Sequence, residues 1–78
     1  MKENELIKLI KKSLKTKQKI DINSKSNNIE EWDSVGHLIL LSNLDKQLKG
    51  ATSNIADIAT ADSVKKIINI LKKNKLIK

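Results

Sequence analysis

Apolar residues in this chain recur three and four positions apart, and no proline interrupts the segments in which they do so. Such spacing places apolar side chains on one face of an α-helix. The pattern predicts three main helices, over about residues 3–14, over about residues 34–49, and after residue 62 or 63. A fourth, short helix is expected after residue 52 or 53. The 78 residues therefore predict one all-α domain, residues 1–78, built as an up-down bundle with a long first loop.

Each predicted helix carries apolar residues that should face the core. The first helix offers Leu6, Ile7, Ile10 and Leu14. The second offers Val35, Leu38, Leu41, Leu44 or Asp45, and Leu48, with Leu40 widening the stripe. The short helix offers Ile55 and Ile58, and the last offers Val64, Ile67, Ile68 and Leu71. Residues 16–33 form an unusually long connection, which we expect to be pinned to the bundle by Ile20, Ile22, Ile29 and Trp32.

The helix ends are marked by residues with capping preferences. Asp33 is a natural N-cap for the second helix, and Gly50 suits its C-terminal end. Thr52 or Ser53 can cap the short helix, and Asp62 or Ser63 can cap the last one.

The net charge of +7 comes entirely from lysine, since none of the sixteen basic residues is arginine. Arginine is the preferred reader of bases and phosphates, and the only aromatic residue is Trp32, so nucleic-acid binding is disfavoured. The segment 26–64 is acidic, and the lysines concentrate on either side of it. No cysteine is present, and we expect no metal site. No apolar run reaches the ~20 residues of a membrane span, so a cytoplasmic location is expected.

The most specific local feature is the segment Glu31-Trp32-Asp33-Ser34-Val35-Gly36-His37-Leu38. Its serine follows an aspartate where the loop gives way to the second helix. That position places a hydroxyl at a helix N-terminus, where free backbone N–H groups and the helix dipole favour a phosphate. The alternative role of Ser34 is that of a simple helix cap, but Asp33 is available for that role.

This segment resembles the Asp-Ser-Leu signature of the acyl carrier proteins. The apolar pattern from Leu38 to Leu48, the long first loop and the Ser63-Val64 start of the last helix are similar to that family as well. The resemblance implies an acyl-carrier-like bundle in which Ser34 carries 4′-phosphopantetheine, taken from coenzyme A by a phosphopantetheinyl transferase. Asp33 is implied to help that transfer. The chain itself would be a monomer and not an enzyme.

The resemblance also implies partners, namely enzymes that transfer or modify acyl groups in fatty-acid or related biosynthesis. Their expected docking surface consists of Glu30, Glu31, Val35, His37, Ile39 and Asp45, with His37 exposed to solvent or facing the partner. An acyl chain is expected to lie between the second and the short helix, in a pocket formed by Leu38, Leu41, Leu44, Ile55 and Ile58.

Three departures from the family stand out. Val35 replaces the usual leucine, Leu48 replaces a frequent phenylalanine, and the second helix lacks the glutamates that typical members display. The last departure favours a dedicated pathway over general fatty-acid synthesis. Two alternatives stay open: an aminoacyl or peptidyl carrier, and an unmodified basic interaction domain. A serine hydrolase is excluded, because the chain has no Gly-x-Ser-x-Gly elbow and no credible oxyanion hole.

Overall fold

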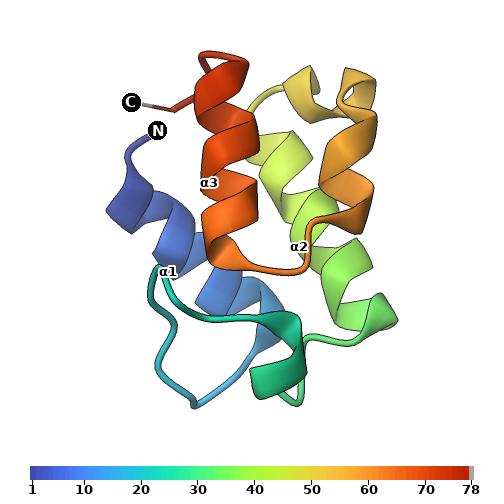
Figure 1. Ribbon diagram of the computed structural model, residues 1–78. Coiled ribbons are helices and arrows are strands. Elements are labelled where there is room, and N and C mark those ends of the chain that lie inside the picture. The colour runs from blue at the N-terminus through green and yellow to red at the C-terminus, as the bar shows by residue number, and fades with distance from the viewer. Residues whose placement is uncertain (78) are drawn as a thin grey trace.

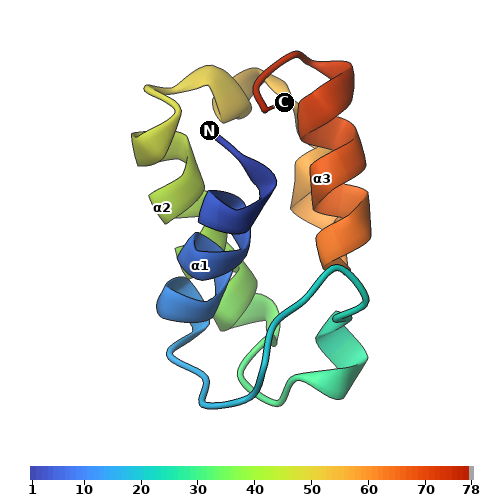
Figure 2. The same ribbon diagram turned by 90° about the vertical axis from the view of Figure 1, so that its left-hand side faces the viewer.

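The computed structural model describes residues 1–77, and within that range it contains three α-helices, three 3₁₀ helices and no strand. Figures 1 and 2 show α1 running in one direction and α2 and α3 running in the other, with the long loop crossing one end. The prediction of a mostly helical domain with three main helices is confirmed. In chain order the elements are α1 (Glu3–Leu14), η1 (Ser26–Asn28), α2 (Ser34–Gln47), η2 (Ala51–Asn54), η3 (Ala56–Thr60) and α3 (Val64–Lys73).

Helix α1 forms where the spacing predicts it. Leu6, Ile10 and Leu14 are buried and Ile7 is half-buried, while the lysines of the helix face solvent. Two glutamates lie in the first turn and two lysines in the last, an arrangement that complements the helix dipole. Lys15 then adopts a left-handed conformation, which ends the helix.

Helix α2 begins at the predicted residue, but only part of its predicted stripe faces the core. Leu40 and Leu44 are fully buried, whereas Val35 and Leu38 are 63% and 67% exposed. The prediction that Val35 and Leu38 belong to the buried stripe is therefore wrong. The helix has large apolar residues on both faces, so spacing alone could not identify the face that contacts α1.

The C-terminal end of α2 is closed by backbone hydrogen bonds. Lys49 and Gly50 both have positive φ angles, and the Gly50 N–H donates to the Asp45 carbonyl over 2.8 Å. The Lys49 N–H donates to the Lys46 carbonyl, which completes a Schellman motif. The left-handed residue that closes this motif is Lys49, and Gly50, which also has a positive φ angle, follows it, so the predicted glycine cap is displaced by one residue.

Residues 51–60 fold as two 3₁₀ helices rather than as one short α-helix. Ile55, which separates them, has an extended backbone. Thr52 does not cap a helix, because its hydroxyl donates to the Asp45 carboxylate of α2 over 2.6 Å. This bond ties η2 to the end of α2.

Helix α3 matches its prediction closely. Ser63 caps it by accepting a hydrogen bond from the Lys66 N–H over 3.1 Å, and all four residues expected to face inward are buried. The long loop is fastened to its start, because the Ser26 N–H donates to the Asp62 carbonyl and the Val64 N–H donates to the Ser24 carbonyl. These two bonds bracket an isolated antiparallel bridge between Lys25 and Ser63.

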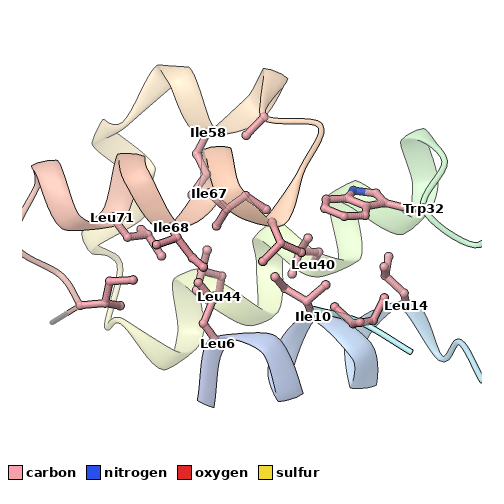
Figure 3. Close-up of a cluster of buried hydrophobic side chains, with 14 of the residues drawn as sticks. Leu6, Ile10, Leu14, Trp32, Leu40, Leu44, Ile58, Ile67, Ile68 and Leu71 are labelled. Atoms are coloured by element: carbon pink, nitrogen blue, oxygen red, sulfur yellow. The ribbon is translucent and has the colours of Figure 1, made fainter. Parts of the chain in front are cut away.

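The core draws side chains from the three α-helices, from η3 and from the loop (Figure 3). Three of the four loop residues expected to pin the connection are buried: Ile20, Ile29 and Trp32. The fourth, Ile22, is 42% exposed, so that prediction is wrong. None of the helices formed by residues 1–77 is long and apolar enough to cross a membrane.

Candidate functional site

At the start of α2 one residue caps the helix and the next residue presents an exposed hydroxyl. The Asp33 carboxylate accepts a hydrogen bond from the Gly36 N–H over 2.8 Å, as predicted for an N-cap. Ser34 is the first residue of the helix and is exposed. Among residues 1–77 no hydrogen bond to the Ser34 hydroxyl is found, so this hydroxyl is not committed to holding the helix end together.

Gly36 allows the loop to pass directly against the first turn of α2. A Cβ at this position would lie 2.1 Å from the Glu31 carbonyl oxygen and 3.1 Å from a methyl group of Leu14. Only glycine fits there without a backbone shift. This packing holds residues 31–33 against the first turn of α2, and it thereby fixes the positions of Asp33 and Ser34. Sequence reasoning missed this role, although a glycine inside a helical pattern is itself a signal of close packing.

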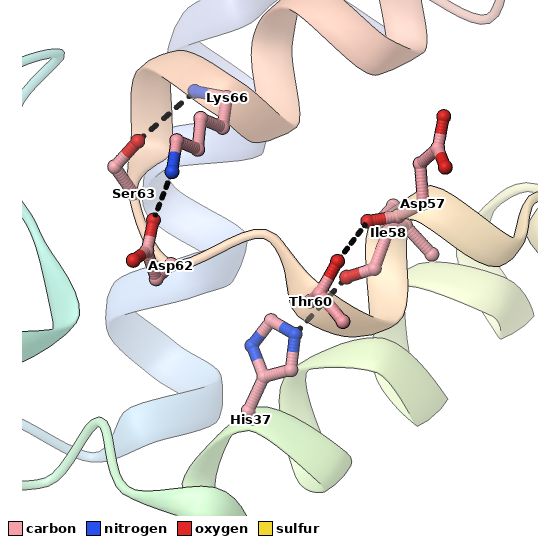
Figure 4. Close-up of polar contacts among 7 residues, drawn as sticks. All are labelled: His37, Asp57, Ile58, Thr60, Asp62, Ser63 and Lys66. Carbon is pink, nitrogen blue, oxygen red and sulfur yellow. Dashed lines mark hydrogen bonds and ion pairs between the residues drawn. The ribbon is translucent and has the colours of Figure 1, made fainter.

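His37 joins three segments of the chain. The indole N–H of Trp32 can only donate, so its 3.0 Å bond requires His37 Nδ1 to accept. His37 Nε2 then carries the proton and donates to the Ile58 carbonyl of η3 over 3.1 Å (Figure 4). The two rings also stack, with centroids 6.2 Å apart. His37 is half-buried and links the loop, α2 and η3, so it is not exposed to solvent as a free side chain; the alternative expectation, that it faces a partner, stays a prediction.

A shallow hollow of about 230 Å³ lies beside Ser34. Trp32 and His37 form part of its wall, and Thr60 and Asp62 lie across from α2. Asp62 pairs with Lys66 over 2.8 Å (Figure 4), and the hydrogen bond and charge of Lys66 lower the pKa of the Asp62 carboxyl. Within residues 1–77 no three histidine or carboxylate side chains gather in a way that could hold a metal ion.

The predicted acidic surface is only partly assembled. Glu30, Glu31 and Asp33 are exposed in the segment that leads to Ser34. Asp45, in contrast, is half-buried and bound by Thr52, and it lies about 16 Å farther along the axis of α2 than Ser34. Asp45 therefore supports the fold at the far end of the helix and does not belong to this acidic group.

Four of the five residues expected to form an acyl pocket are packed in the core or against it. Leu44 and Ile58 are buried in the core, and Leu41 and Ile55 are half-buried against it. Leu38 points into solvent. An acyl chain entering here would have to displace packed side chains.

Leu38 instead belongs to an exposed apolar patch on α2, which we define as Val35, Leu38 and Ile39. Leu38 and Ile39 follow Val35 by three and four positions, so all three share one side of the helix, immediately after Ser34. Ile39 is 45% exposed, in agreement with its expected accessibility. Val35 and Leu38 join it because the core uses the other face of α2.

Comparison of the chain with protein-family models, with curated proteins and with solved structures finds no match.

Proposed function

We propose that this chain is a carrier protein that holds acyl groups as thioesters on a 4′-phosphopantetheine arm attached to Ser34. The single observation that supports the proposal is that two different residues at the start of α2 cap the helix and present the hydroxyl. Asp33 supplies the cap, and Ser34 presents an exposed hydroxyl at the N-terminus of a rigid helix. A phosphate ester formed there would lie near the free N–H groups and the positive end of the helix dipole.

Attachment requires little chemistry from the chain itself. The Ser34 oxygen would form a bond to the phosphorus of the pantetheine phosphate in coenzyme A. The diphosphate bond would break, adenosine 3′,5′-bisphosphate would leave, and the serine proton would pass to a base of the transferase. The chain contributes an accessible nucleophile on a fixed element, held in place by Gly36 and by the contacts of His37.

The surface around Ser34 suits recognition by a partner enzyme. Exposed carboxylates, Glu30 and Glu31, precede the serine, and the exposed apolar patch follows it. Exposed apolar side chains that adjoin one another are typical of interaction surfaces. The acidic residues would act mainly on association rate and specificity. The patch would supply the buried contact of the complex.

The test is incubation with coenzyme A and a phosphopantetheinyl transferase of broad specificity, followed by intact mass measurement. We expect the chain to gain the mass of one phosphopantetheine group. Ser34→Ala should gain none, and Ser42→Ala, which removes an exposed serine from the same helix, should be modified like the wild type. Modification of Ser34→Ala, or a wild-type chain that stays unmodified, would contradict the proposal.

The kind of group carried is a separate question. Loading of the modified chain by an acyl ligase supports an acyl carrier, whereas loading by an amino-acid adenylating enzyme alone supports an aminoacyl carrier. An unmodified interaction domain would be loaded by neither.

A further inference from the structure

A lysine-lined groove runs between α1 and α2, outside the site around Ser34. Its volume is about 650 Å³. Four exposed lysines line it, two in α1, one at the C-cap that follows α1 and one in α2: Lys8, Lys12, Lys15 and Lys46. Half-buried Met1 and Leu9 also line it, and the only carboxylate among its lining residues is Glu5. We call this feature the lysine groove.

The charges of the lysine groove are not neutralised within the described chain. The two ion pairs found among residues 1–77 use Lys66 and Lys72, neither of which lines the groove. The groove therefore presents four positive charges against the one carboxylate of Glu5. Repulsion among these lysines is relieved when an anionic surface comes close.

We propose that the lysine groove docks the chain on a lipid surface that contains anionic headgroups. Lysine is a compact point charge on a flexible stem and lacks the fork with which arginine reads one carboxylate or base. Lysines alone suit a diffuse layer of lipid phosphates, to which each adds attraction.

Docking through the lysine groove would leave Ser34 accessible. Gly36 lies on the side of α2 that faces α1, since its position contacts Leu14. Successive residues turn by about 100° round a helix, so Ser34, two residues earlier, points about 200° away from Gly36. The apolar face of α1 is buried in the core, so binding would be electrostatic and peripheral, without insertion of that helix.

The experiment is co-sedimentation of the unmodified chain with vesicles of phosphatidylcholine, with and without phosphatidylglycerol, at low and high salt. We expect binding only to the anionic vesicles, and weaker binding at high salt. The variant Lys8→Gln/Lys12→Gln/Lys46→Gln should bind on the order of 100-fold more weakly, at about fivefold per lysine. The matched control Lys17→Gln/Lys19→Gln/Lys65→Gln carries the same charge change on exposed positions outside the groove, and should lose less than tenfold.

Three outcomes would overturn the proposal: no binding of the wild type to anionic vesicles, equal losses in the two triple variants, or tight binding to a polyglutamate peptide with none to vesicles. The last would assign the groove to an acidic protein partner. Circular dichroism of each variant confirms that it is folded. The test does not involve modification of Ser34, so its failure and the failure of the carrier proposal are separate results.

Discussion

Helices α2 and α3 use their apolar residues in different ways. Helix α3 buries all four residues of its stripe, from Val64 to Leu71, and its exposed side consists mainly of lysine and asparagine. Helix α2 buries Leu40 and Leu44 and leaves Val35, Leu38 and Ile39 in solvent. One apolar face is enough to hold a helix in this core. The second face of α2 is much less buried than the first, and it adjoins the proposed modification site.

The largest effect on stability is expected from truncating the buried face of α2. Leu40→Ala should lower the free energy of unfolding by about 2–5 kcal/mol, because it removes a fully buried side chain and leaves a cavity. Leu38→Ala on the exposed face should change it by less than about 0.5 kcal/mol. Urea unfolding of both variants measures the difference, and a larger loss for Leu38→Ala would reverse the assignment of the two faces.

The next effect concerns the close approach at Gly36. Gly36→Ala should destabilise the chain by about 1–3 kcal/mol, because its methyl group would overlap the Glu31 carbonyl unless the loop moves. Ser42→Ala, an exposed position of the same helix, serves as the control in the same urea titration. Alanine is the better helix former, so a gain in stability for Gly36→Ala would show that the loop does not pack as described.

His37→Ala should lower the free energy of unfolding by about 1–2 kcal/mol, because it leaves the buried indole N–H of Trp32 without an acceptor. Trp32 is the only tryptophan, so its fluorescence reports the change directly. We expect the emission of His37→Ala to shift to longer wavelength as water reaches the ring. His37→Asn, whose side-chain oxygen can accept in place of Nδ1, should recover part of the loss. Unchanged emission in His37→Ala would contradict the contact.

The smallest effect concerns the exposed pair of Asp62 and Lys66 at the start of α3. Lys66 lowers the pKa of Asp62 below its ordinary value of 3.8, so the ionised carboxylate favours the folded state. That contribution is complete above pH 3.8 and is lost as the pH falls through the lower, folded pKa. Asp62→Asn should remove this part of the acid dependence and leave stability at neutral pH almost unchanged. A large loss of stability of Asp62→Asn at pH 7 would contradict the small contribution expected of this exposed pair.

The contrast between α2 and α3 also explains which parts of the structure the sequence could predict. Helices α1 and α3 have one apolar face each, so spacing located the bounds of α1 and the buried sides of both helices, and the capping residue Ser63 located the start of α3. Helix α2 is apolar on two sides, and the choice between them depends on where α1 lies. Sequence spacing contains no information on that point.

The site shows the same division. Asp33 and Ser34 could be assigned from the sequence because capping is local, between residues three apart. The roles of Gly36 and His37 could not, since they depend on the Glu31 carbonyl and on the carbonyl of Ile58, which is 21 residues from His37. Leu38 was placed in both the predicted stripe and the predicted acyl pocket, and its exposure corrects both at that residue, because the position of α1 decides which side of α2 is buried.

The most direct test of the central claim is to locate the modification within the chain. After treatment with coenzyme A and the transferase, cleavage after lysine yields the peptide 26–46, which contains three serines: Ser26, Ser34 and Ser42. Fragmentation of this peptide in the mass spectrometer assigns the added group to one of them. We expect a single phosphopantetheine on Ser34. A group on Ser26 or Ser42, or an unmodified peptide, would contradict it.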